Sequence, residues 1–196
     1  MIDSLEGLTD GQARGSSLLP GWSVGHVLTH VARNADSFVG MLAGAEEGEV
    51  VAQYPSMLSR NADIEAGSSR SAETLMADVR ASIERLEGQF SGATGAVWRG
   101  SGIGFLGPVP MTEVPWRRWR EVEVHHGDLG LGFTFADWSP AYVRTELPRM
   151  QMLWASRQPM GLTELPGLAL AETPAVRLAW LMGRTSITGL SPAGVF

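Results

Sequence analysis

Apolar residues recur along residues 24–42 with the spacing of one helical face. At about 100° per residue they fall on a single stripe, which is the pattern of an amphipathic helix with one buried side. Ser23 stands directly before the stripe, where a hydroxyl can accept a hydrogen bond from the first helical turn. The pattern predicts a helix from Val24 to about Gly44 with this apolar face: Val24, Val27, Leu28, Val31, Ala35, Phe38, Val39 and Leu42.

Other stretches show the same helical pattern, so the chain is predicted to be mainly helical. Residues 2–14 form a short helical stretch, and residues 71–90 carry an apolar face after a serine cap. Residues 115–129 begin at a proline and stop at a glycine. A further helix is predicted to open at Pro140 and to end or kink at Pro148. An antiparallel helical bundle is the natural architecture for such a set of helices.

The segments between these helices are predicted to be irregular. Residues 48–70 are expected to be mostly loop, with room for a short helix near Met57, and residues 91–112 form a Gly-rich loop. A loop of that length in a compact domain is more often functional or mobile than filler. In the tail, residues 162–171 are predicted to be extended and residues 174–183 helical. We expect two domains, a helical bundle over residues 1–157 and a short segment over residues 158–196.

Composition and charge narrow the function. The chain has 196 residues and a net charge of −6 without a block of like charge, which disfavours nucleic-acid binding because that needs a basic surface. No apolar run approaches the roughly twenty residues of a membrane span, and the acidic N-terminus is unlike a signal peptide. The chain has no cysteine, which excludes disulfides and cysteine-ligated metals. We expect a cytoplasmic protein that acts on a small molecule, without nucleic-acid or membrane partners.

Two histidines and a glutamate are the candidates for a metal site. Glu121 and His125 are four residues apart, so a helix places them on one face. On the predicted helix 24–44, His30 lies roughly 120° from the centre of the apolar stripe, whereas His26 lies roughly 160° away and is expected to face solvent. Two imidazoles and one carboxylate from two helices can bind a divalent metal and leave positions open for a substrate. A thiol used at that metal would come from outside the chain.

The same residues also have simpler explanations. Glu121, His125 and Asp128 belong to a polar line that fits a solvated helix face with ion pairs. His26 and His30 are four apart as well and could form an alternative two-histidine pair, although both would then reach the ion from the outer side of their helix. If the first site exists, Asp128 or a backbone carbonyl could accept the free N–H of a ligating imidazole.

Two stretches resemble the signatures of a known family. Residues 18–36 read LLPGWSVGHVLTHVARNAD, and residues 118–130 read RWREVEVHHGDLG. In this order they are similar to the two signatures of the mycothiol-dependent maleylpyruvate isomerase family, which belongs to the DinB-like metal-binding bundles. The resemblance covers about residues 5–157. It implies a mainly α fold, a DinB-like antiparallel four-helix bundle, with a short, reduced C-terminal appendage.

The resemblance also implies a metal site and a reaction. It implies a divalent metal, most simply zinc, held by His30, Glu121 and His125, and it implies mycothiol, the small thiol of bacteria without glutathione, as a cofactor. The characterised reaction of the family converts maleylpyruvate to fumarylpyruvate. A thiolate adds to the activated double bond, the resulting single bond rotates, and elimination gives the trans isomer. We therefore expect a metal- and mycothiol-dependent isomerase.

Substrate carboxylates require a cation, and arginine can bind them through two parallel hydrogen bonds. Residues 178–184, LAWLMGR, resemble a segment of the family's C-terminal domain that ends in a functionally important arginine. Arg184 is therefore the first candidate for a catalytic residue, ahead of Arg120 and Arg33. An arginine at the end of a helix also has a purely structural explanation, because cations stabilise that end.

Both ends of the chain look shortened when they are compared with the family. The family's first helix usually begins well before the position of Ile2, and little of its α/β domain is expected around Arg184. A shortened bundle would expose apolar surface, which a homodimer could cover. Three alternatives to isomerisation stay open: mycothiol S-transfer to another electrophile, a non-catalytic bundle stapled by a metal, and a metal-free helical protein.

Overall fold

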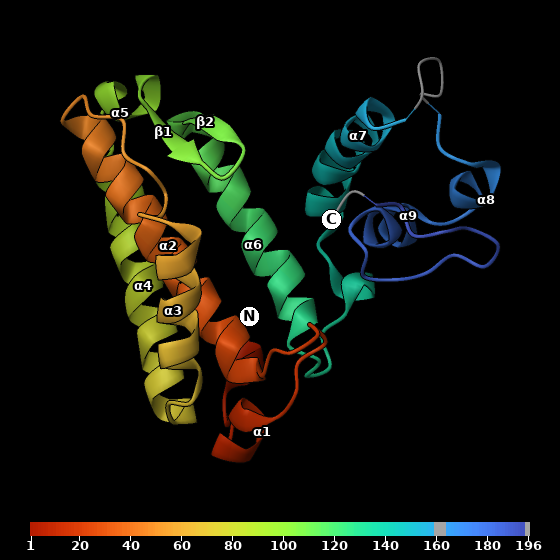
Figure 1. Ribbon diagram of the computed structural model, residues 1–196, viewed down its shortest axis with the longest axis horizontal. Helices are drawn as coiled ribbons and strands as arrows, with labels where there is room; N and C mark the ends of the chain where they lie inside the picture. The colour runs from red at the N-terminus through yellow and green to blue at the C-terminus, as the bar shows by residue number, and fades with distance from the viewer. Residues whose placement is uncertain (159–163, 195–196) are drawn as a thin grey trace. The chain divides into compact units, whose positions relative to one another are not determined.

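The computed structural model describes residues 1–158 and 164–194, and the predicted mainly helical fold is confirmed (Figure 1). The chain divides into two compact units, residues 1–130 and residues 131–196. The domain boundary expected from the sequence lies after Arg157 instead, and that boundary stays a prediction. No helix among the described residues combines the length and apolar character needed to cross a membrane.

The first unit contains a four-helix bundle in which α2 is the central helix. α2 packs against α3, α4 and α6, and α2 and α4 run in one direction while α3 and α6 run in the other (Figure 1). Two short helical pieces precede the bundle where one short helix was predicted. The elements of this unit are η1 (Asp3–Leu5), α1 (Asp10–Arg14), α2 (Val24–Glu46), α3 (Met57–Ser68), α4 (Ala72–Gly92), α5 (Gly95–Arg99), β1 (Ser101–Gly104), β2 (Gly107–Pro110), η2 (Met111–Glu113) and α6 (Val114–Asp128).

The start of α2 follows from the residues around it. Ser23 is the N-cap, as predicted: its hydroxyl accepts a hydrogen bond from the backbone N–H of His26, and the His26 ring accepts one from the backbone N–H of Ser23. This reciprocal pair satisfies two N–H groups that a helix start otherwise leaves open. The predicted apolar stripe is buried along the helix, apart from the partly buried Val39. The sequence pattern therefore identified the central helix correctly.

Two glycines let α2 and α3 approach each other closely. A Cβ atom at Gly25 would lie 2.1 Å from the carbonyl oxygen of Ser68, and one at Gly67 would lie 2.5 Å from Cγ2 of Thr29. Real Cβ atoms essentially never come so near, so any larger residue here would push the helices apart. The close contact brings side chains of α3 to the face of α2 that carries His26 and His30.

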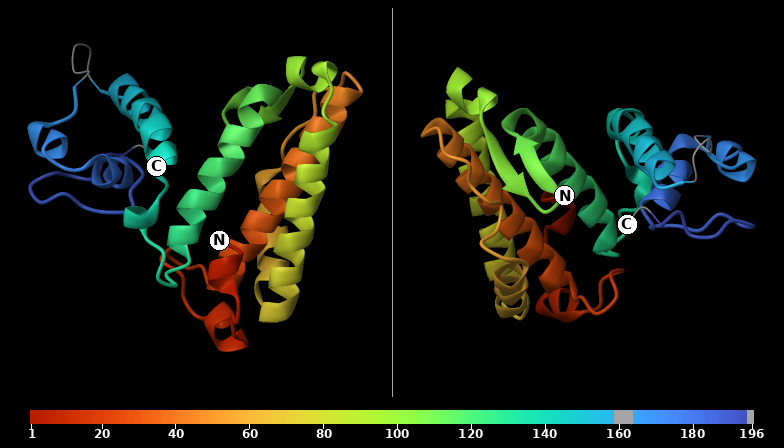
Figure 2. Two further views of the ribbon diagram at one scale, coloured as in Figure 1. Left: turned by 180° about the vertical axis from the view of Figure 1, so that it is seen from behind. Right: turned by 45° about the horizontal axis from the view of Figure 1, so that its top comes forward.

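Two segments predicted to be irregular are structured. The short helix allowed for near Met57 is α3, a 12-residue helix of the bundle. Residues 91–112 contain α5 and an antiparallel β-hairpin, β1–β2. Figure 2 shows the hairpin at the end of the bundle where α2 and α4 finish, leading into α6. Val97, Val109 and Met111 from this segment join the buried core of α2. The segment was missed because its glycines and prolines divide the apolar residues into short pieces, so that no helical period shows in the sequence.

The second unit is a smaller group of helices, η3 (Phe135–Asp137), α7 (Pro140–Ser156), α8 (Gly167–Leu170) and α9 (Pro174–Leu181). The helix predicted over residues 174–183 is confirmed as α9. Of the two outcomes predicted for Pro148, an end or a kink of its helix, the end does not occur: α7 continues to Ser156, with Leu147, Met150 and Trp154 buried around the proline. The extended segment predicted over 162–171 is wrong over α8, while Leu162 and Thr163 lie outside the described residues.

Candidate metal centre

The structure brings His30, Glu121 and His125 together between α2 and α6. Nε2 of His30 lies 2.9 Å from Oε2 of Glu121 and 3.1 Å from Nε2 of His125. Nε2 of His125 lies 3.5 Å from the same carboxylate oxygen. One nitrogen or oxygen atom from each residue therefore faces a common centre, and these three side chains form a potential ligand group for a metal ion.

The spacing of these atoms fits a small divalent cation. Ligands placed tetrahedrally at the usual zinc distances lie roughly 3.3 Å from one another, and the three observed separations of 2.9, 3.1 and 3.5 Å lie around that value. Two imidazoles and a carboxylate are also a donor set that zinc and similar metals accept, with one position left for a further ligand. The identification of the three residues as metal ligands stays a prediction.

Asp128 orients His125, as the sequence analysis suggested. Its Oδ2 lies 2.8 Å from Nδ1 of His125, so Nδ1 carries a hydrogen and Nε2 points to the common centre. Burial alone would lower the pKa of His125, but its hydrogen bonds with Asp128 and Glu121 raise that pKa to about 9. Burial would raise the pKa of Glu121, but the hydrogen bonds from His125 and His30 hold that pKa well below its usual range. Glu121 is therefore ionised at neutral pH.

His30 is the most buried of the three residues, and it is 5% exposed. Burial lowers its pKa, although the hydrogen bond with Glu121 acts in the opposite direction, so the ring is neutral at pH 7. Its Nδ1 lies 3.1 Å from Nη2 of Arg60 on α3, and its ring meets the edge of Trp22 with centres 5.7 Å apart. The site thus has a neutral buried ring on α2 and a charged pair on α6.

Arg118 ties α6 to α2 near this site. Its Nη1 donates hydrogen bonds to the carbonyl oxygen of Val31 and to Oδ1 of Asn34, at 2.8 and 3.0 Å. Burial lowers the pKa of Arg118 to about 10 against the attraction of Glu121, so the guanidinium remains charged at neutral pH. These bonds hold the Glu121 face of α6 against the His30 face of α2.

His26 does not belong to the group, as the helical wheel predicted. The expectation that His26 faces solvent is wrong. Its side chain is only 17% exposed, because its Nδ1 bonds Ser23 at the helix cap and its Nε2 lies 3.1 Å from Oε2 of Glu65 on α3. His126 points elsewhere and lies 2.6 Å from the hydroxyl of Ser4. The alternative pairing of His26 with His30 on one ion is not formed.

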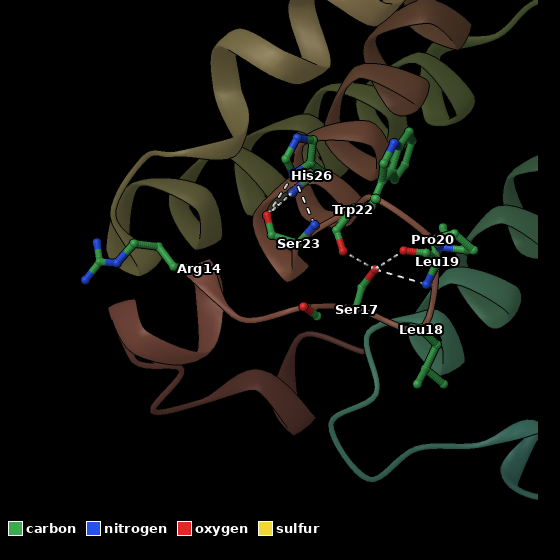
Figure 3. Close-up of a pocket in the computed structure, with 10 residues that line it drawn as sticks. Arg14, Ser17, Leu18, Leu19, Pro20, Trp22, Ser23 and His26 are labelled. Carbon is green, nitrogen blue, oxygen red and sulfur yellow. Dashed lines mark hydrogen bonds between the residues drawn. The ribbon is translucent and has the colours of Figure 1, made fainter.

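A pocket of about 460 Å³ lies beside the cap of α2 (Figure 3). Trp22 connects it to the triad, since its ring stacks on His26 with centres 6.1 Å apart and also contacts His30. In Figure 3 the hydroxyl of Ser17 bonds the backbone across the loop that forms one wall. The lining residues are Arg14, Ser16, Ser17, Leu18, Leu19, Pro20, Gly21, Trp22, Ser23 and His26.

The candidate substrate arginines lie in different surroundings. Arg184 follows α9 in the second unit, where its Nη1 donates to the carbonyl oxygen of Met182 at 2.7 Å, and its catalytic role stays a prediction. Arg33 forms ion pairs with Asp36 and Asp78, so its charge is already matched. Arg60 is a cation that contacts the triad, at His30. It was not a candidate from the sequence, because residues 48–70 were expected to be mostly loop.

The chain resembles known proteins both in sequence and in fold. The family described as "Mycothiol maleylpyruvate isomerase N-terminal domain" matches residues 1–130. Among solved structures, the chain is similar to the mycothiol-dependent maleylpyruvate isomerase and to a histidine-to-alanine mutant of that enzyme. Each comparison has a TM-score of 0.81 and 25% identity, and covers 94% of this chain and 83% of the other. A search of curated proteins found no match. The structural similarity confirms the DinB-like bundle that the sequence predicted.

Proposed function

Because the chain belongs to the mycothiol maleylpyruvate isomerase N-terminal domain family, we propose that it is a metal- and mycothiol-dependent enzyme that isomerises maleylpyruvate to fumarylpyruvate. The observation that carries the proposal is the convergence of His30, Glu121 and His125 on one point, within a fold shared with that isomerase. A cytoplasmic location and small-molecule partners, a thiol and a carboxylate substrate, are part of the same proposal.

The residues of the chain would prepare the site in three ways. Glu121 supplies the negative charge that a divalent cation requires, and His30 supplies a neutral ring. Asp128 fixes the orientation of His125 by accepting its Nδ1–H. A divalent cation held there would lower the pKa of a nearby thiol, so that a nucleophilic thiolate exists at neutral pH. Arg184 is our proposed partner for a substrate carboxylate, on the strength of the sequence resemblance.

The first test combines metal content with turnover. The purified protein, loaded with zinc, is assayed with maleylpyruvate and either mycothiol or glutathione. We expect about one bound metal per chain and turnover with mycothiol. Equal turnover with glutathione would remove mycothiol from the proposal, and full activity after the metal has been stripped by a chelator would remove the metal.

Two matched variants identify the ligands. His30→Gln removes one imidazole from the triad, and we expect it to lose both bound metal and activity. His26→Gln removes the other imidazole of α2, and glutamine can keep the capping pair with Ser23, so this control should retain both properties. If the two variants behaved alike, His30 would not be a ligand.

Adding mycothiol and an electrophile without a cis double bond to the same samples tests the alternative S-transfer reaction.

A further inference from the structure

Arg60 is a cation of α3 that contacts the triad without a carboxylate partner. Its Nη2 lies 3.1 Å from Nδ1 of His30, and its Nη1 donates a hydrogen bond to Oδ1 of Asn61 at 2.9 Å. Its Cζ also lies 6.0 Å from the ring centre of Trp22 and 5.8 Å from that of Tyr54. Within the part of the chain that the structure describes, no carboxylate forms an ion pair with Arg60.

The contact between Arg60 and His30 depends on where the imidazole carries its hydrogen. An arginine N–H can only donate, so the contact requires a bare Nδ1 and places the hydrogen of a neutral His30 on Nε2. In this state Nε2–H donates to Glu121 at 2.9 Å, and the 3.1 Å approach of Nε2 of the protonated His125 is not a hydrogen bond, because both rings then direct an N–H to the same carboxylate. If His30 instead offers its Nε2 lone pair to a cation, the hydrogen moves to Nδ1. Two N–H donors would then face each other across 3.1 Å, and the contact can no longer form.

With a cation held there, Arg60 would lose its contact with His30 and would be able to pair with another acceptor beside the site. Its aromatic neighbours, Trp22 and Tyr54, attract the guanidinium and keep it at the site. They offer no anion to match its charge. The side chain is only partly buried, so a ligand can reach it. A planar guanidinium without a carboxylate partner is suited to a carboxylate, which it can bind with two parallel charge-assisted hydrogen bonds.

We propose that Arg60 forms an anion subsite that binds a carboxylate of the substrate beside the metal, and that it becomes available when His30 turns its Nε2 lone pair to the cation. This inference rests on the proposed metal-dependent function. It assigns to Arg60 in the first unit a role in substrate binding that the sequence resemblance suggests for Arg184 in the second. Arg60 is thus a specificity residue for carboxylates and not a metal ligand.

The test uses maleate, a small cis dicarboxylate, and calorimetric titration of the full-length, zinc-loaded protein. We expect maleate to bind the wild type, and Arg60→Met to weaken its binding by about tenfold or more, because charge-assisted hydrogen bonds are lost. Arg60→Lys keeps the positive charge but loses the planar guanidinium that can donate two parallel hydrogen bonds. Its affinity for maleate should therefore lie between those of the wild type and Arg60→Met. Arg80→Met makes the same charge change at an exposed arginine of α4. Its affinity for maleate should stay within about twofold of the wild-type value, because solvent and salt screen a distant exposed charge.

Zinc affinity provides the second readout. Arg60→Met should bind zinc at least as tightly as wild type, because no contact with His30 has to be broken first. Maleate binding that does not weaken in Arg60→Met, or that weakens equally in Arg80→Met, would overturn the proposal. Loss of zinc in Arg60→Met would also overturn it, since Arg60 would then build the metal site. Arg60-dependent maleate binding by a protein that does not turn over maleylpyruvate would uphold the subsite and refute the isomerase function.

Discussion

Binding of a metal at the triad should release a proton from His125. In the metal-free protein the hydrogen bonds with Asp128 and Glu121 raise the pKa of this ring to about 9, so Nε2 is protonated at pH 7. A metal can bind Nε2 only after that proton has left. Glu121 is already ionised and His30 is already neutral, so neither residue releases a proton when the metal binds.

The size of the effect follows from the pKa. Two pH units below a pKa of about 9, roughly 1% of His125 rings are neutral, so the apparent metal affinity at pH 7 is about 100-fold below its limit at high pH. This corresponds to about 3 kcal/mol of binding free energy. Between pH 7 and pH 8.5 the affinity should therefore rise about tenfold per pH unit and become less steep towards pH 9.

Calorimetric zinc titrations at pH 7, in buffers with different enthalpies of ionisation, measure the number of protons released. We expect about one from His125, and competition with a chelator of known affinity should give the pH slope. A metal-bound water can also lose a proton, so Asp128→Asn serves as the control: it removes a hydrogen bond that raises the pKa of His125 and should reduce the release. Proton release that is near zero, or that is identical in the variant, would refute the conclusion that His125 is the source of the proton.

Three further predictions concern the ligand set and the bundle. Glu121→Gln should lower zinc affinity by more than the roughly 10–100-fold typical of an outer hydrogen-bond partner while leaving the circular dichroism of the helices unchanged; full zinc occupancy would remove Glu121 from the ligands. Gly25→Ala should destabilise the protein by about 1–3 kcal/mol in urea unfolding, because its Cβ would meet the carbonyl oxygen of Ser68. Gly40→Ala, on the same helix with open space around it, should stabilise the protein by about 0.5–1 kcal/mol, and equal effects would contradict the close-approach argument. Ser23→Ala should cost about 1 kcal/mol by the same measurement, and no loss would show that the cap contributes nothing.

Local patterns in the sequence determined the long helices and much of the candidate site. The apolar stripe after Ser23 has a helical period, and a period is a property of the chain itself, so α2 could be predicted before any contact was known. The same reasoning placed Glu121 and His125 on one helical face and preferred His30 to His26. It also named Asp128, or else a backbone carbonyl, as an acceptor for the free N–H of an imidazole in the candidate group, and in the structure Asp128 bonds Nδ1 of His125.

Only the tertiary structure decided what lies between these helices. Arg60 reaches His30 because Gly25 and Gly67 let α3 approach α2, and a close approach between distant residues leaves no periodic signal in a sequence. The β-hairpin was missed for a related reason: its strands are short and rich in glycine and proline, and they are held by pairing with each other and by burial against α2. Helical periodicity arises within a segment, whereas the surroundings of His30 arise from segments far apart in the chain, and only folding brings them together.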